Sequence, residues 1–193
     1  MFLIPIRQTQ LIFAIVLLLC LTVMPLPESF SDSLRYDRNA ILDGQWWRMI
    51  SANFVHLGWG HFFMNAAGAL LVLYFFGRCV APWGWLATFI GSSVFIAAMI
   101  LWLHPGIYWY VGLSGALHGL FVVGGLADTR VRPLEGWIFL GLIVIKLAWE
   151  QVMGALPGSE AMAGGPVLTE AHLYGALGGL LVWGLIRRWM PAS

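Results

Sequence analysis

The sequence contains little charge and little cysteine. Only 10% of its 193 residues are charged, the formal net charge is +1, and 60% of the residues are hydrophobic. This composition excludes an ordinary soluble domain and indicates an all-α polytopic membrane protein. The small, scattered charge argues against a nucleic-acid partner. Cys20 and Cys79 lie in or beside apolar runs, so the sequence predicts no disulfide framework, no metal site and no cofactor.

Six apolar segments are separated by polar or glycine-rich stretches. At about 20 residues per crossing, a chain of this length holds about six helices, so we expect a single membrane domain over residues 1–193. The expected spans are 9–26, 61–77, 84–103, 114–127, 136–150 and 171–187. We expect residues 28–60 to form a tryptophan-rich loop in the membrane interface and residues 155–166 to form a mobile loop over the site.

The distribution of arginines predicts the orientation of the chain. In the six-span arrangement, one side of the membrane receives most of the cations outside the first loop. These are Arg7, Arg78, Arg130, Arg132, Arg187 and Arg188. Because cytoplasmic loops carry an excess of Lys and Arg, both termini are predicted to be cytoplasmic. No good small-residue cleavage site follows the first apolar run, so we expect that run to be a retained anchor.

Polar residues recur at one depth on three of the expected spans. The second, fourth and sixth spans all run inward, and their first turns carry His61 with Asn65, Ser114 with His118, and His172. Taken separately, Ser114 between glycines is typical of close helix packing, and His61 with Asn65 is typical of a polar clamp between helices. Together they place imidazole, amide and hydroxyl groups near the outer membrane face, as a candidate site requires.

Glycines beside these polar residues predict a close contact between the fourth and sixth spans. Gly115 follows Ser114, and Gly175 and Gly179 lie three and seven residues after His172, on the same helix face. Small residues let two membrane helices approach closely. That approach would bring the imidazole within hydrogen-bond reach of the hydroxyl.

This pairing has a known chemical use. A serine hydroxyl attacks a carbonyl effectively when a base of near-neutral pKa takes its proton and returns it to the leaving amine. No carboxylate lies at this depth on the three spans, so we expect a Ser-His dyad of Ser114 and His172. The backbone N–H of Ser114, helped by His61 and Asn65, is expected to stabilise the oxyanion.

Several short motifs resemble those of the rhomboid family of intramembrane serine proteases. They are Gly112-Leu113-Ser114-Gly115, Ala171-His172-x-x-Gly175 and His61-x-x-x-Asn65, with Trp47-Arg48 and His56 in the first loop. The resemblance covers all six expected spans in order. It implies a six-helix rhomboid-like bundle surrounded by membrane lipid, serine endopeptidase activity on a transmembrane substrate, and lateral substrate access between the second and fifth helices.

Two features depart from the commonest rhomboid pattern. His118 stands where many rhomboids carry an aromatic residue, and Lys146 and Glu150 form an i,i+4 pair on the fifth span. Such a pair can be a structural bridge, although ionisable groups within spans are usually functional. These features resemble the rhombosortase branch. That resemblance implies a bacterial inner-membrane location and an exported protein substrate with a C-terminal Gly-Gly, an apolar helix and a basic end.

Three other readings remain open from the sequence. They are a generic rhomboid protease of other transmembrane substrates, a non-catalytic relative that binds membrane segments, and a small transporter. The presence of both Ser114 and His172 favours an enzyme, and the absence of an internal repeat disfavours a transporter. Hydrolysis and transpeptidation are both possible, and His118 could orient His172, hold a water or donate to the oxyanion.

Overall fold

The chain forms a bundle of long helices in a computed structural model that describes residues 6–190. The long helices are α1 (Ile6–Val23), α5 (Trp59–Phe76), α6 (Pro82–Leu103), α7 (Ser114–Asp128), α8 (Pro133–Met153) and α10 (Thr169–Ile186). Among the described residues, α1, α5, α6 and α8 are long and apolar enough to cross a membrane. The protein is therefore an integral membrane protein whose helix α7, at 15 residues, is shorter than a typical span.

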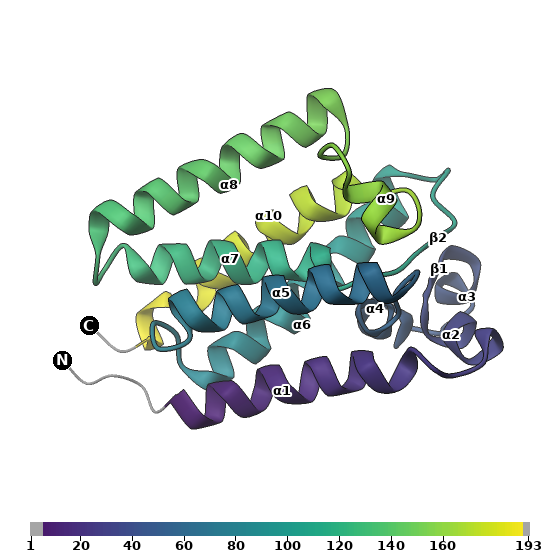
Figure 1. The fold of residues 1–193 in the computed structure, drawn as a ribbon, viewed down its shortest axis with the longest axis horizontal. Helices are drawn as coiled ribbons and strands as arrows, with labels where there is room; N and C mark the ends of the chain where they lie inside the picture. The colour runs from purple at the N-terminus through teal and green to yellow at the C-terminus, as the bar shows by residue number, and fades with distance from the viewer. Residues whose placement is uncertain (1–5, 191–193) are drawn as a thin grey trace.

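Helix α7 occupies the centre of the bundle (Figure 1). It packs against α5, α6, α8 and α10, while α1 lies along one edge on α5 and α6. The main core fills the space between these helices and includes Phe13, Val72, Trp85, Val123 and Trp183. Because α7 is surrounded by other helices, even its polar residues are largely shielded from lipid.

Local sequence signals account for where several elements begin and end. Pro82 and Pro133 stand in the first turns of α6 and α8, where a missing N–H costs nothing. Gly154 follows α8 with a φ of 81°, a conformation that glycine adopts easily. The Asp37 carboxylate accepts a hydrogen bond from the N–H of Ala40 at 3.0 Å and thereby caps a short helix.

The expected first loop is largely structured. It contains α2 (Glu28–Leu34), strand β1 (Tyr36–Asp37), α3 (Arg38–Leu42), α4 (Arg48–Ser51) and a 3₁₀ turn (Ala52–Phe54). Arg48 is 8% exposed and holds this segment together through Gln45 Oε1 and the carbonyls of Asp32 and Arg35. These helices are too short for hydrophobic periodicity to reveal them.

A two-stranded ribbon anchors the segment that leads into α7. Strand β1 pairs in antiparallel fashion with β2 (Trp109–Tyr110), and Tyr36 lies opposite Tyr110. Farther along, the N–H of Gly112 donates to the carbonyl of Ala52 at 3.0 Å. The backbone immediately before Ser114 is therefore fixed from two sides.

The expected loop over residues 155–166 contains one short helix, α9 (Ser159–Ala163). Gly158 and Gly164 flank it, with φ values of 82° and 80°. Its backbone lies so close to α5 that a side chain added at Gly60 would overlap the carbonyl of Met162. Helix α9 is thus seated directly on the N-terminal end of α5. A 3₁₀ turn (Arg187–Trp189) follows α10.

Candidate active site

Ser114 and His172 lie in contact at the N-terminal ends of α7 and α10. The distance between Ser114 Oγ and His172 Nε2 is 3.0 Å, within hydrogen-bond range. Ser114 is the first residue of α7, and His172 stands in the first turn of α10. The pairing that the helix depths and glycine spacing predict is the one that the structure contains.

Glycines on both helices make this contact possible. A Cβ at Gly175 would strike the carbonyl of Gly115, and one at Gly179 would strike the backbone of Gly119. The backbones of α7 and α10 therefore touch at two points that lie one helical turn apart. Such contact is available only to residues without side chains, so Gly115, Gly175 and Gly179 lie in the helix interface rather than in the cavity.

A carboxylate stands behind the imidazole. Glu150 on α8 is 3% exposed, and its Oε2 lies 2.9 Å from His172 Nδ1. Because a carboxylate oxygen accepts, Nδ1 carries the proton and Nε2 presents its lone pair to Ser114, so the hydroxyl donates to it. The other oxygen, Oε1, lies 2.7 Å from Lys146 Nζ. The expected two-residue site is therefore incomplete, because a carboxylate from the fifth long helix reaches it.

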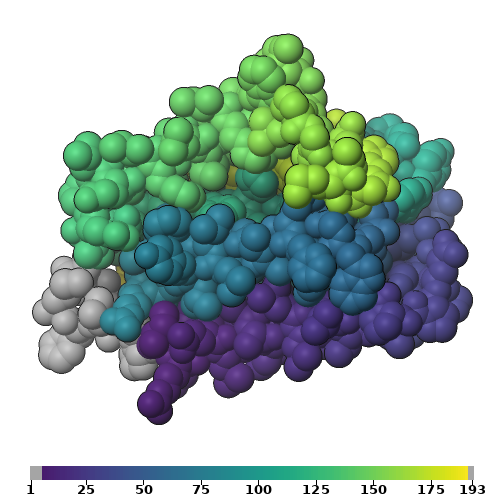
Figure 2. Space-filling model, viewed as in Figure 1, coloured from purple at the N-terminus to yellow at the C-terminus, as the bar shows by residue number. Residues whose placement is uncertain are grey.

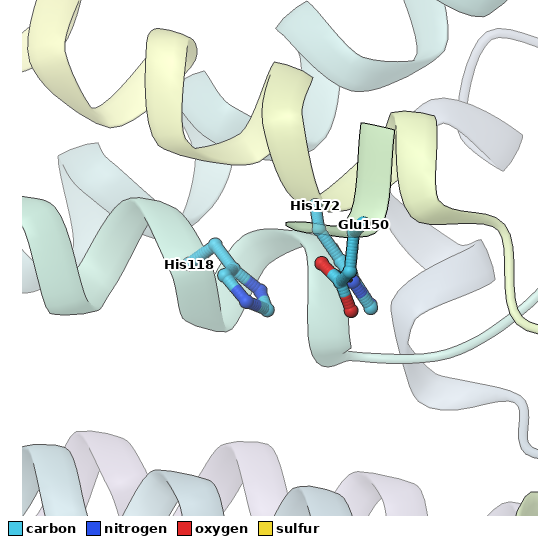
Figure 3. A group of neighbouring side chains, drawn as sticks. All are labelled: His118, Glu150 and His172. Carbon is cyan, nitrogen blue, oxygen red and sulfur yellow. Dashed lines mark hydrogen bonds and ion pairs between the residues drawn. The ribbon is translucent and has the colours of Figure 1, made fainter. Parts of the chain in front are cut away.

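His118 stacks on the ring of His172. Their ring centroids are 4.3 Å apart and the planes are inclined by 21°. His118 Nδ1 lies 2.7 Å from the carbonyl oxygen of Ser114, so it donates and its Nε2 is left with a lone pair. Figure 3 shows His118, Glu150 and His172 side by side. Of the roles open to His118, this stacking favours orientation of His172.

His61 and Asn65 form the opposite wall. The N–H of Leu57 donates to His61 Nδ1 at 3.4 Å, which leaves Nε2–H of the neutral ring available as a donor. The Asn65 Nδ2 group is buried and has no hydrogen-bond partner among residues 6–190. Gly112, with a φ of 117°, leaves room for the His61 ring, since a Cβ there would lie 2.7 Å from Nε2. Two side chains with free N–H donors thus line the same cavity as Ser114.

These groups line a cavity of about 540 Å³. It lies between α5 and α8, beneath α9, and Figure 2 shows the surface hollowed along this line. The sequence-predicted residues that line it are His61, Asn65, Gly112, Ser114, His118, Lys146, Glu150 and His172. Its walls otherwise include apolar side chains such as Met64 and Phe121, so a peptide with an apolar part fits its chemistry.

His56 lies just outside the cavity wall and packs edge-on against His61, with ring centroids 5.0 Å apart. Burial, followed by the nearby His61, lowers the pKa of His56 to about 3. The ring is therefore neutral at physiological pH and acts here as a packing group.

One group of side chains has the composition of a metal site. The ligand atoms of His118, Glu150 and His172 all lie within 4.8 Å of one another. Sequence inspection did not anticipate this cluster, because its members come from three helices and share no ligand spacing. The one local signal was the Lys146–Glu150 pair, an ionisable pair inside an otherwise apolar helix.

Comparison with known proteins places these residues in a family. The rhomboid domain family matches residues 43–189, which include every residue of the site. The chain is also 28% identical over 142 residues to the protein named "Putative rhomboid protease YdcA" from Bacillus subtilis (strain 168). That match covers 74% of this chain and 68% of the relative.

Proposed function

Because this chain belongs to the rhomboid family, we propose that it is an intramembrane serine endopeptidase of the rhombosortase branch. The observation that carries the endopeptidase proposal is the 3.0 Å contact between Ser114 Oγ and His172 Nε2, made inside a cavity that opens between α5 and α8. The assignment to the rhombosortase branch is supported by His118 and the Lys146–Glu150 pair. A hydroxyl and an imidazole in this contact are the nucleophile and the base of acyl transfer.

Acylation begins when the Ser114 hydroxyl attacks the scissile carbonyl. His172 Nε2 takes the hydroxyl proton as the C–O bond forms, and the carbonyl becomes a tetrahedral oxyanion. Collapse of this intermediate breaks the C–N bond, and His172 returns the proton to the leaving amine. The acyl-enzyme on Ser114 then reacts with water, or with an amine if the enzyme is a transpeptidase.

Glu150 and Lys146 support this proton transfer. Once His172 has taken the proton it is an imidazolium, and the buried Glu150 carboxylate at 2.9 Å stabilises that charge. The same hydrogen bond keeps the proton of the neutral ring on Nδ1. Lys146, 2.7 Å from the other carboxylate oxygen, pairs with Glu150 and holds the carboxylate in position beside His172.

The oxyanion is stabilised from the opposite wall. The first N–H groups of α7 have no partner within their own helix, and the Ser114 N–H is the first of them. His61 Nε2–H and the unpartnered Asn65 amide add two side-chain donors. Donors fixed before the reaction stabilise the developing charge without reorganisation, which is the largest contribution in many acyl-transfer enzymes.

We infer a topology of six spans with both termini cytoplasmic, in the bacterial inner membrane. Helices α1 and α10 support it, since α1 begins and α10 ends at the same end of the bundle (Figure 1). In this orientation the site lies near the outer face, and substrates approach laterally between α5 and α8. The exposed Trp46 and Trp47 suit an interfacial position for the first loop, and α9 acts as the cap.

The proposed substrate is an exported protein with a C-terminal Gly-Gly, an apolar helix and a basic end. An apolar helix is stable in the membrane, so its peptide bonds are protected from attack until the helix unwinds. A glycine pair at its end lowers the cost of unwinding, because glycine is a poor helix former. Small side chains also suit the wall beside His61, where Gly112 itself is needed for clearance.

Co-expression with a reporter tests this function. The reporter is a secreted domain followed by Gly-Gly, an apolar helix and a basic tail, expressed with wild type, Ser114→Ala or His172→Ala. We expect loss of the tail with the wild type alone. Equal release in all three strains would refute serine proteolysis of this substrate.

A second reporter distinguishes a rhombosortase from a generic rhomboid protease. It keeps the helix and the basic end but replaces Gly-Gly with Val-Val, and a third carries an unrelated transmembrane segment. Cleavage of all three by the wild type would indicate a generic rhomboid protease. Binding of the segments without cleavage would indicate a non-catalytic relative.

A further inference from the structure

One imidazole of the stacked pair in the candidate site, that of His118, has the hydrogen-bond pattern of a metal ligand. His118 Nδ1 donates to the Ser114 carbonyl at 2.7 Å, and His172 Nδ1 donates to the Glu150 carboxylate at 2.9 Å. Histidines that bind metals usually donate their other N–H to a carbonyl or carboxylate in this way, which fixes the ring and raises its basicity. His118 is thus held in place with an Nε2 lone pair free of a proton, whereas the nitrogen of His172 that lies beside Glu150 is Nδ1, which would give up its proton to share an ion with that carboxylate.

The cluster also has the right size and composition. Figure 3 shows the two rings and the Glu150 carboxylate together, and a ligand atom from each lies within 4.8 Å of the other two. Zinc bonds imidazole nitrogen and carboxylate oxygen at about 2.0–2.2 Å, so ligand atoms on one ion lie roughly 3–3.6 Å apart. Rotamer adjustments of ~1–2 Å would bring the three groups to one ion. Two histidines and a glutamate are a common zinc ligand set.

We propose that His118, Glu150 and His172 bind Zn²⁺ or a similar divalent transition metal, and that the bound ion inhibits the enzyme. Both ring nitrogens of His172 already serve the reaction, Nε2 toward Ser114 and Nδ1 toward Glu150. A metal on either nitrogen breaks one of these hydrogen bonds. Metal binding and proteolysis therefore exclude each other. The inhibition rests on the proposed function, whereas the metal site itself does not.

Lys146 determines how tightly the ion is held. Its ammonium group lies 2.7 Å from Glu150 Oε1, so it competes with the metal for the same carboxylate. Lys146 lines the cavity and its side chain is 27% exposed, so it can move aside when a dication arrives. Removal of this positive charge should tighten metal binding, whereas removal of a ligand should weaken it.

Zinc titration of the purified full chain in detergent tests the site directly. Calorimetry is performed in the Ser114→Ala background, so that the readout does not depend on activity. We expect one Zn²⁺ per chain, with at least tenfold weaker binding for His118→Phe and for Glu150→Gln. Lys146→Met should bind several-fold more tightly. Co²⁺ in place of Zn²⁺ should give the intense visible absorption of a tetrahedral site, and His118→Phe should abolish it.

The phenylalanine variant is a matched control because it keeps an aromatic ring against His172 while removing the ligand nitrogen. Equal zinc affinities in all four proteins, or no binding in any, would overturn the proposed site. Inhibition by zinc is then measured in proteins that keep Ser114, with each variant compared to its own zinc-free rate. The zinc concentration for half inhibition should rank the variants in the same order as their zinc affinities. Specific binding in a chain that cleaves no substrate would instead refute the proposed function and leave the metal site standing.

Discussion

Replacement of Glu150 by glutamine tests whether the carboxylate takes part in the reaction. The change keeps the size of the side chain and removes its charge from a position that is 3% exposed. A hydrogen bond to a charged partner is worth about 1.5–3 kcal/mol. At about 1.4 kcal/mol per tenfold change in rate, its loss when His172 becomes an imidazolium lowers kcat by about 10- to 150-fold.

Two further effects increase this loss. The amide can present its NH₂ group to His172 Nδ1, which would favour the wrong tautomer of the ring. Lys146 would also lose its anionic partner and place an unpaired positive charge near the imidazolium. We therefore expect a loss of at least about 100-fold in kcat with a smaller change in KM. The double variant Lys146→Met/Glu150→Gln should be faster than Glu150→Gln alone.

The assay is cleavage of a transmembrane reporter in proteoliposomes, with kcat and KM measured separately. Glu135→Gln is the matched control, because Glu135 lies in the first turn of the same helix and is exposed. Thermal unfolding of each variant checks that the fold is intact. A kcat for Glu150→Gln within about threefold of wild type would refute the role assigned to Glu150.

Three other predictions concern the remaining parts of the site. Asn65→Ala and His61→Ala each remove one oxyanion donor, so kcat in the proteoliposome assay should fall about 10²–10³-fold. The Tm of each variant should stay close to that of the wild type. An unchanged kcat would exclude the oxyanion role. Gly60→Ala should lift α9 off α5 and expose residues 158–164 to limited proteolysis, whereas Gly58→Ala, whose new Cβ meets nothing within 4 Å, should not. Gly175→Ala should destabilise the fold by about 1–3 kcal/mol and lower Tm, because the added methyl group meets the Gly115 backbone. The control Gly184→Ala, on the same helix, adds its methyl group in open space and should not lower Tm.

The pairing of Ser114 with His172 could be predicted because it depends on local and repeated features. Apolar segment length gives the depth of each polar residue, and glycine spacing gives the face on which two helices can touch. Both inferences can be made for each helix separately, without knowing how neighbouring helices are rotated about their axes.

The contact between Glu150 and His172 does depend on such a rotation. Within its own helix Glu150 is already paired with Lys146, so the sequence pattern is satisfied locally and indicates no third partner. The carboxylate reaches His172 because α8 packs beside α10 and points this face at the site. The β1–β2 ribbon was missed for a similar reason, since each strand is two residues long and pairs with a distant segment.

Active-site labelling of the purified wild-type protein is the most direct test of the central claim. A fluorophosphonate reacts covalently with a serine only when a nearby base activates its hydroxyl, and mass spectrometry of the digested protein identifies the labelled residue. We predict a label on Ser114 in the wild type, none in Ser114→Ala and little in His172→Ala. A label on another serine, or equal labelling of Ser114 with and without His172, would contradict the account.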